Sequence, residues 1–321
     1  MPAIFSLLSA VLPIGFFVWI VWILDRYDRE PIYLVSIHFF WGAFGAVFFG
    51  ILLSVLTSAL LGTNDFLDVV FVAPFVEELT KGALLFLTVR SRQFDNVTDG
   101  LVYGMAIGLG FGMTENFLYF LSASSPAEWI FLVIVRTFFS AVMHAMATGT
   151  VGAAFGITKF RFPGYSTPIR IGGFLLAMFM HFLWNFSVSV ESMGAAGLGM
   201  VYIVISVAVI LILFQISLNH EKKLILAELT EEAEAGFLPT DHIPYLCRLR
   251  TRKNPFWISN GIEKEQYIKL AVTLAFRKAQ SRMCRQNEVD SYLEEVDALR
   301  GQIAAMLYPP PDTLSDGTKL V

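Results

Sequence analysis

Five ionisable side chains stand within otherwise apolar stretches of this 321-residue chain: Glu77, Glu78, Glu115, His144 and His181. Carboxylates and imidazoles can exchange protons or bind a divalent metal, so the set suits hydrolysis or proton transfer. On insertion scales, one charged group at mid-membrane costs about 2.5–3.5 kcal/mol, which packing alone does not require. We therefore expect these groups to face the interior of a helix bundle and to serve a function.

Glu77 and Glu78 are adjacent acids, and Lys81 follows them at spacings of four and three residues. Either carboxylate can therefore pair with Lys81 on one face of a helix, while the other points about 100° away. Two neighbouring carboxylates in a low dielectric resist double ionisation, so one can hold a proton and serve as general acid or base. A buried ion pair that only fixes helix packing is the alternative.

Glu115 and His144 each allow a structural and a chemical interpretation. Glu115 can be a packing partner for Arg136 on the following helix, or a catalytic or metal-binding carboxylate. His144, taken alone, is more often a hydrogen-bonded core histidine. His181 and Asn185 stand four residues apart, so they share a helix face and can donate and accept toward one point. A simple packing pair is as common.

The composition indicates that lipid surrounds these residues. Hydrophobic residues make up 55% of the chain and charged residues only 16%, against about 25% charged in soluble proteins. A spanning helix needs about 20 mainly apolar residues. Seven segments meet that length, and they predict an all-α, polytopic membrane protein: 4–24, 32–61, 67–89, 98–122, 129–158, 169–190 and 195–218. The net charge of −4 does not suggest a nucleic-acid partner.

The basic residues predict how the helices are oriented. The first, third and fifth loops carry Lys or Arg, whereas the second, fourth and sixth carry only acids. Because basic loops stay on the cytoplasmic side, we expect the N-terminus outside and the C-terminus inside a cell membrane. The basic residues in question are Arg26, Arg29, Arg90, Arg92, Lys159, Arg161 and Arg170.

The charges also divide the chain into domains. Residues 219–321 hold 14 of the 23 Lys and Arg residues, and 15 of the 27 acids. We therefore predict a transmembrane domain over 1–218, a mainly helical cytoplasmic region over 219–308 and a disordered end over 309–321. Both cysteines, Cys247 and Cys284, lie in that cytoplasmic region, where thiols stay reduced.

Glycines recur at steps of four in the fourth segment, at Gly100, Gly104, Gly108 and Gly112. This spacing lines one face of a helix with bare backbone. A neighbouring helix can then approach closely.

The ordered set of motifs resembles the PrsW family of intramembrane proteases, distant relatives of the CAAX prenyl endopeptidases. The matching elements are Glu77-Glu78-Leu79-Thr80-Lys81, Asp99 to Gly104, Gly110 to Asn116, His144, and His181 to Asn185. The resemblance covers roughly residues 65–190, and it implies hydrolysis of peptide bonds within or beside the membrane. The substrates it implies are membrane-anchored proteins, anti-sigma factors among them.

The resemblance assigns catalysis to Glu77, Glu78, Glu115, His144, His181 and Asn185. Two mechanisms fit these residues. In the first, Glu77 or Glu78 activates a water while a histidine or Asn185 stabilises the oxyanion, with no cofactor. In the second, Glu78, Glu115, His144 and His181 supply ligands to zinc, although the chain lacks the His-Glu-x-x-His spacing of common zinc peptidases.

Two other classes of protein can use the same residues. A proton-coupled transporter or channel builds proton relays from intramembrane Glu, His and Arg. A non-catalytic scaffold would bind other membrane helices through the glycine face. The order of the motifs and the lack of internal repeats favour the peptidase. The oligomeric state stays open.

Overall fold

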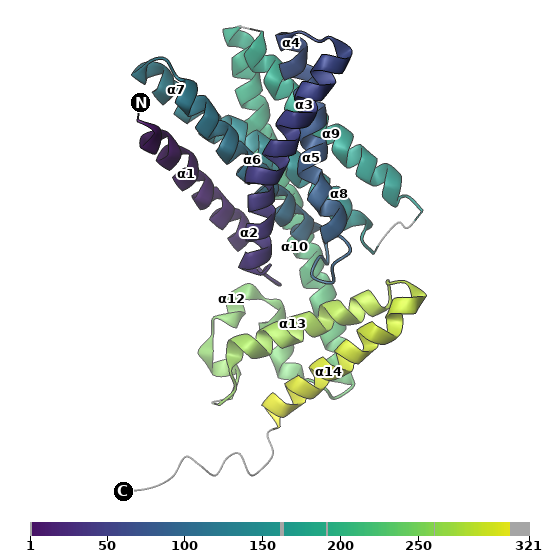
Figure 1. The fold of residues 1–321 in the computed structure, drawn as a ribbon. Coiled ribbons are helices and arrows are strands. Elements are labelled where there is room, and N and C mark those ends of the chain that lie inside the picture. Colours follow the sequence, from purple (N-terminus) through teal and green to yellow (C-terminus); the bar gives the residue numbers. More distant parts are fainter. Residues whose placement is uncertain (1, 161–163, 191, 260, 309–321) are drawn as a thin grey trace, which may run out of the picture. The chain divides into compact units, whose positions relative to one another are not determined.

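The computed structural model describes residues 2–160, 164–190, 192–259 and 261–308, and every regular element in these ranges is a helix (Figure 1). The all-α prediction is confirmed. The chain divides into two compact units, one of Met1–Asp25 with Arg29–Ser217, the other of Arg26–Asp28 with Leu218–Val321. The predicted disordered end, 309–321, lies outside the described residues.

The first unit is a bundle of long apolar helices joined by short turns (Figure 1). The division between the two units falls within its last helix. The elements are α1 (Ala3–Leu24), α2 (Ile32–Phe40), η1 (Trp41–Ala46), α3 (Val47–Leu61), α4 (Asp65–Leu67), η2 (Asp68–Val72), α5 (Ala73–Thr88), α6 (Val97–Ser122), α7 (Pro126–Val135), η3 (Arg136–Ser140), α8 (Ala141–Thr158), α9 (Ser166–Ser189) and α10 (Met193–Glu234).

Five helical stretches in the described residues are long and apolar enough to cross a membrane, so this is a multi-pass membrane protein. They are Ala3–Leu24, Ile32–Leu61, Pro126–Thr158, Ser166–Ser189 and Met193–Glu234. Two of the seven predicted spans are not among them. One of them contains Glu77, Glu78 and Lys81, and these charges lower its hydropathy. The other is α6, whose hydropathy is lowered by its many glycines and its polar residues.

Helix α6 packs against α8 through the glycine face, as its spacing predicts. The Cα of Gly100 faces the backbone of Gly152, and Gly104 faces the backbone of Thr148 and Gly149. Gly108 faces the backbone of His144 in the same way. No Cβ fits at these contacts, so glycine is required for the two backbones to lie this close. This close approach fixes the position of α8 relative to α6.

Three helical stretches contain π-helical turns: η1 between α2 and α3, η2 before α5, and η3 between α7 and α8. Such turns are rare and occur mostly at functional sites. Here η2 and η3 immediately precede the helices that carry Glu77 and His144. Each π-helical turn therefore changes the hydrogen-bond pattern of the helix one to three turns before the residue in the cluster.

The second unit has its own apolar core around Tyr267, Leu246, Cys247 and Val272. Lys278 lies among acids at one side of that core, 2.7 Å from Glu232 Oε1. The elements that follow α10 in this unit are η4 (Thr240–His242), α11 (Ile243–Cys247), α12 (Leu249–Arg252), η5 (Pro255–Trp257), α13 (Lys264–Ser281), η6 (Gln286–Glu288) and α14 (Val289–Leu307).

Candidate active site

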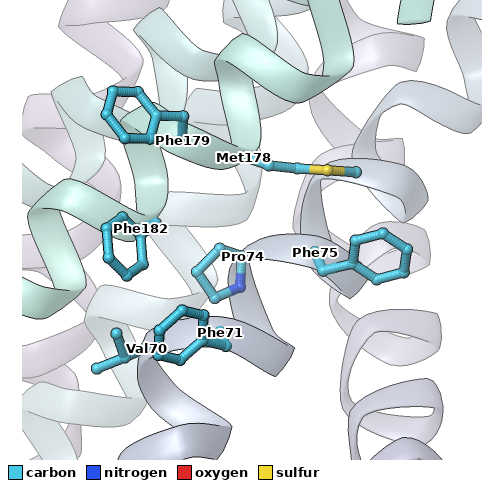
Figure 2. Close-up of a pocket in the computed structure, with 7 residues that line it drawn as sticks. All are labelled: Val70, Phe71, Pro74, Phe75, Met178, Phe179 and Phe182. Atoms are coloured by element: carbon cyan, nitrogen blue, oxygen red, sulfur yellow. The ribbon is translucent and has the colours of Figure 1, made fainter.

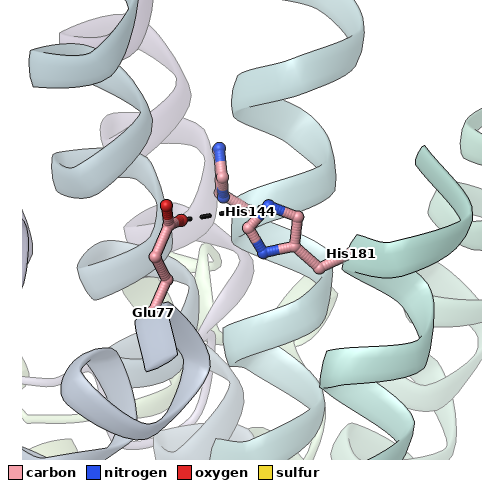
Figure 3. A group of neighbouring side chains, drawn as sticks. All are labelled: Glu77, His144 and His181. Atoms are coloured by element: carbon pink, nitrogen blue, oxygen red, sulfur yellow. Dashed lines mark ion pairs between the residues drawn. The ribbon is translucent and has the colours of Figure 1, made fainter. Parts of the chain in front are cut away.

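Four helices of the bundle bring their ionisable side chains together in one cluster. Helix α5 contributes Glu77 and Glu78, α6 contributes Glu115, α8 contributes His144 and α9 contributes His181. Figure 3 shows Glu77 and the two histidines directed toward one another from three of these helices. The two imidazole rings meet edge to face, with centroids 4.8 Å apart.

Glu78 is fully buried, and both of its carboxylate oxygens are occupied. Its Oε1 accepts from Lys81 Nζ at 2.8 Å and from His181 Nδ1 at 3.0 Å. Its Oε2 accepts from Thr148 Oγ1 at 3.1 Å. Three donors from three helices therefore hold this carboxylate in place.

Lys81 determines the tautomer of His144. The Lys81 ammonium, itself fully buried, lies 2.9 Å from His144 Nδ1 and can only donate. His144 Nδ1 must then accept, so the ring proton is on Nε2. That nitrogen donates to Glu115 Oε2 at 2.6 Å. A continuous chain of hydrogen bonds thus runs from Glu78 through Lys81 and His144 to Glu115.

Glu115 also forms an ion pair with Arg136, the packing partner that the sequence suggested for it. Arg136 Nη2 lies 2.8 Å from Glu115 Oε2, and the guanidinium stacks 3.6 Å over the ring of Tyr119. The structural and chemical interpretations of Glu115 are therefore compatible. One carboxylate oxygen binds both Arg136 and His144, which links α6 to the η3–α8 stretch.

Glu77 is the partly exposed carboxylate of the adjacent pair, with 17% of its side chain accessible. Its Oε2 lies 3.4 Å from Lys81 Nζ and 3.9 Å from His181 Nε2. Its Oε1 makes no hydrogen bond to any residue in the part of the chain that the structure describes. His181 donates through Nδ1 to Glu78, so the lone pair of its Nε2 faces Glu77.

Asn185 does not join the cluster. Its Nδ2 donates to the carbonyl oxygen of Val69, at 2.8 Å, and so ties α9 to η2. The predicted convergence of His181 and Asn185 on one point is absent. His181 turns toward Glu77 and Glu78, whereas Asn185 binds backbone.

Among the described residues, one group of side chains has the arrangement of metal ligands: Glu77, His144 and His181. Each offers one donor atom, and these atoms lie within 4.8 Å of one another. The sequence had proposed Glu78 and Glu115 as the carboxylate ligands. In the structure, Glu78 instead binds Nδ1 of His181, and Glu115 binds Nε2 of His144. Carboxylates behind metal-bound histidines commonly bind one ring nitrogen in this way.

Thr148 is a member of the cluster that the sequence did not single out. It follows His144 by four residues, so the two share a face of α8. That spacing was the available signal. A buried threonine in an apolar helix is too ordinary to be noticed without the carboxylate it binds.

The fold and the cluster together define a class of protein: a multi-pass membrane protein with carboxylates and imidazoles enclosed between its helices. The chain belongs to the PrsW family of intramembrane proteases. Its sequence matches the family described as PrsW family intramembrane metalloprotease over residues 30–213. This range contains every residue of the cluster.

Similar proteins carry the same name in several bacteria. The chain is 30% identical over 234 residues to Protease PrsW of Clostridioides difficile (strain 630), a match that covers 70% of this chain and 96% of that protein. It is 31% identical over 137 residues to Protease PrsW of Bacillus subtilis (strain 168), covering 42% and 61% of the two chains. No solved structure gives a significant match.

Proposed function

We propose that this protease cleaves membrane-anchored proteins and that Glu77 is its general base. The observation that carries the proposal is the unpartnered Oε1 of Glu77, on a carboxylate that lies beside His181 and is partly exposed. A base must be within hydrogen-bond reach of a water and must have an oxygen free to take its proton. Glu78 has neither property, because all its oxygens are occupied in a buried setting.

In this mechanism a water bound near Glu77 and His181 Nε2 attacks the carbonyl carbon of the scissile peptide bond. Glu77 takes one proton from the water as the carbon–oxygen bond forms. The tetrahedral intermediate then breaks its carbon–nitrogen bond, and the proton passes from Glu77 to the departing nitrogen. The products are a carboxylic acid and an amine, which exchange a proton to become a carboxylate and an ammonium, so the atoms of one water are accounted for.

The other charged residues are positioning groups in this scheme. Glu78 fixes the ring of His181 and the ammonium of Lys81. Glu115 fixes the ring of His144. The Lys81 ammonium, fully buried and 3.4 Å from Glu77 Oε2, holds that carboxylate in place.

The donor set also fits a divalent metal, in line with the family description. Glu77, His144 and His181 would hold the ion. This requires Lys81 to release His144 Nδ1, and it makes Glu77 a ligand in place of the base. Both histidines already bind a carboxylate through the other ring nitrogen. A bound zinc ion supplies Lewis acidity and acidifies a bound water. Equilibrium dialysis against zinc tests this directly: His181→Ala should weaken binding by tenfold or more.

We further propose that α4–η2–α5 and α6 cross the membrane with the five apolar stretches, which gives seven spans with the N-terminus outside. The alternation of basic and acidic loops supports this orientation. In this arrangement 1–218 form the transmembrane protease domain and 219–308 a helical cytoplasmic region. The cluster then lies at mid-membrane, shielded by the apolar helices that carry its residues.

The decisive experiment compares the wild-type chain with Glu77→Gln in vesicles that also contain a bacterial membrane-protein fraction. New protein termini are mapped by mass spectrometry. We expect termini within or beside membrane spans for the wild type, and a loss of about 10²–10⁴-fold for the variant, the usual contribution of a general base. Glu294→Gln, at an exposed position on α14, is the control. Equal cleavage by the wild type and Glu77→Gln would exclude Glu77 as the base.

A further inference from the structure

A pocket of about 340 Å³ lies beside the cluster, between η2–α5 and α9 (Figure 2). All of its lining side chains are apolar, and four of them are aromatic. They are Val70, Phe71, Pro74, Phe75, Met178, Phe179 and Phe182. Its volume is at the lower end of the range for ligand pockets, and is sufficient for one or two bulky apolar side chains.

The pocket and the proposed base share two helices. Pro74 precedes Glu77 by three residues on α5, and Met178 precedes His181 by three on α9. Three residues rise about 4.5 Å along a helix. The pocket therefore begins about one helical turn from Glu77 on α5 and about one turn from His181 on α9.

Three contacts in succession join the same two segments. His181 Nε2 lies 3.9 Å from Glu77 Oε2, the rings of Phe182 and Phe71 lie 5.1 Å apart, and Asn185 binds Val69. The pocket surrounds the middle contact of the three. It therefore lies in the interface between α9 and η2–α5, with the polar cluster at one side of it.

The pocket is open toward the surface of the bundle. Phe71, Phe75 and Phe179 on its rim are each more than half exposed, at 53%, 55% and 54%. In a multi-pass membrane protein an exposed apolar rim faces acyl chains, the medium in which a membrane-spanning substrate also lies. A helix that diffuses in the bilayer can thus reach the pocket without leaving lipid.

We propose that this pocket binds a bulky apolar side chain from the membrane-spanning segment of the substrate, next to the peptide bond that is cut. The proposal rests on the peptidase mechanism proposed above. Acyl chains are as apolar as the pocket, so discrimination between side chains comes from van der Waals fit, and we expect it to change kcat/KM by about tenfold. The pocket is then the element that selects which bond is cut.

The first test uses the full chain in phosphatidylcholine–phosphatidylglycerol vesicles. The probes are single-span leucine–alanine helices with lysine ends, in which one position is Ala, Leu, Phe or Trp. We expect the wild type to cut beside Phe or Leu about tenfold faster than beside Ala. Met178→Trp, which fills the pocket, should reverse this preference, and Phe179→Ala, which enlarges it, should favour Trp.

Phe131→Ala is the matched control, because Phe131 is 60% exposed on α7 and does not line the pocket. It should keep the wild-type preference. A preference for bulky residues that is identical in Met178→Trp, Phe179→Ala and the wild type would overturn the proposal. Since a preference is a ratio between probes, reduced folding of a variant does not alter it.

The second test separates this pocket from the catalytic proposal. A benzophenone amino acid replaces Phe179, or Phe131 as control, in the Glu77→Gln background. Light should crosslink position 179, but not position 131, to the probe helix. Adducts with lipid alone at position 179 would overturn the pocket assignment. Adducts with the helix, together with no cleavage of any probe by the wild type, would support the pocket and refute the peptidase mechanism.

Discussion

Substitution of Gly108 by alanine should displace His144 while leaving every ionisable group in place. A Cβ at Gly108 would lie 2.6 Å from the carbonyl carbon of His144 and 2.8 Å from Cα of Ala145, where ordinary contact begins near 3.4 Å. Both neighbours are backbone, so no side chain can rotate away. Helix α8 must therefore move away from α6 by about 0.8 Å or more.

That displacement acts on the two hydrogen bonds that hold the imidazole of His144. They measure 2.9 Å to Lys81 Nζ and 2.6 Å to Glu115 Oε2, and a shift of this size lengthens or breaks both. Misplacement of about 1 Å within an active site can reduce the rate about 100-fold, even where the displaced group only positions others. At 1.36 kcal/mol for each factor of ten, the loss is about 2.7 kcal/mol of transition-state stabilisation.

The assay is cleavage of the single-span probes by purified Gly108→Ala, together with its thermal unfolding in detergent. Gly172→Ala is the matched control, because Gly172 lies on α9 with nothing within 4 Å of a Cβ. Gly100→Ala tests the same interface two helical turns away from His144 and should lower stability with a smaller effect on rate. Activity above half the wild-type value in a folded Gly108→Ala protein would refute this account of how His144 is positioned.

Three more predictions concern charge, thiol chemistry and orientation. Lys81→Met should lower the free energy of unfolding by about 3–5 kcal/mol, because it leaves the buried Glu78 carboxylate without its ammonium partner. The double variant Lys81→Met with Glu78→Gln should regain stability in denaturant titrations, but it should regain no activity. A double variant as unstable as Lys81→Met alone would contradict this pairing. Burial raises the pKa of Cys247 to about 11, so at pH 8 only about one molecule in a thousand carries the thiolate there. Alkylation, followed by intact-mass spectrometry, should therefore modify Cys284 before Cys247. The rate of alkylation at Cys247 should rise about tenfold per pH unit up to that pKa. Equal rates at the two thiols in folded protein would count against the core of the second unit. An impermeant maleimide should label Cys284 in broken cells but not in intact cells, and labelling of intact cells would reverse the proposed orientation.

The sequence was sufficient to predict the gathering of the charged residues. Insertion of Glu, His and Lys into apolar helices is costly enough that a shared interior is the expected solution. The glycine spacing on α6 likewise predicted a close helix neighbour, and the structure shows α8 there. Both inferences depend on periodicity within one helix, which local sequence encodes directly.

The division of roles between Glu77 and Glu78 was beyond such reasoning. Both acids stand within reach of Lys81, and only the neighbouring helices decide which is enclosed. Thr148 and His181 close around Glu78, while Glu77 keeps a free oxygen. Asn185 shows the same limit, since its partner is a backbone carbonyl in another helix. Contacts between helices depend on rotation about each axis, which spacing along one helix does not specify.

The number of residues between η3 and His144 determines whether His144 faces Glu115. A π-helical turn holds one residue more than an α-helical turn, so loss of one residue from η3 would restore α-helical hydrogen bonding and leave α8 in its present rotation. Loss of one residue from α8 itself, between η3 and His144, would instead turn His144 about 100° away from Glu115, while Arg136 stayed against that carboxylate. A one-residue deletion in that part of α8 would thus separate the two groups with every side chain of the cluster still present.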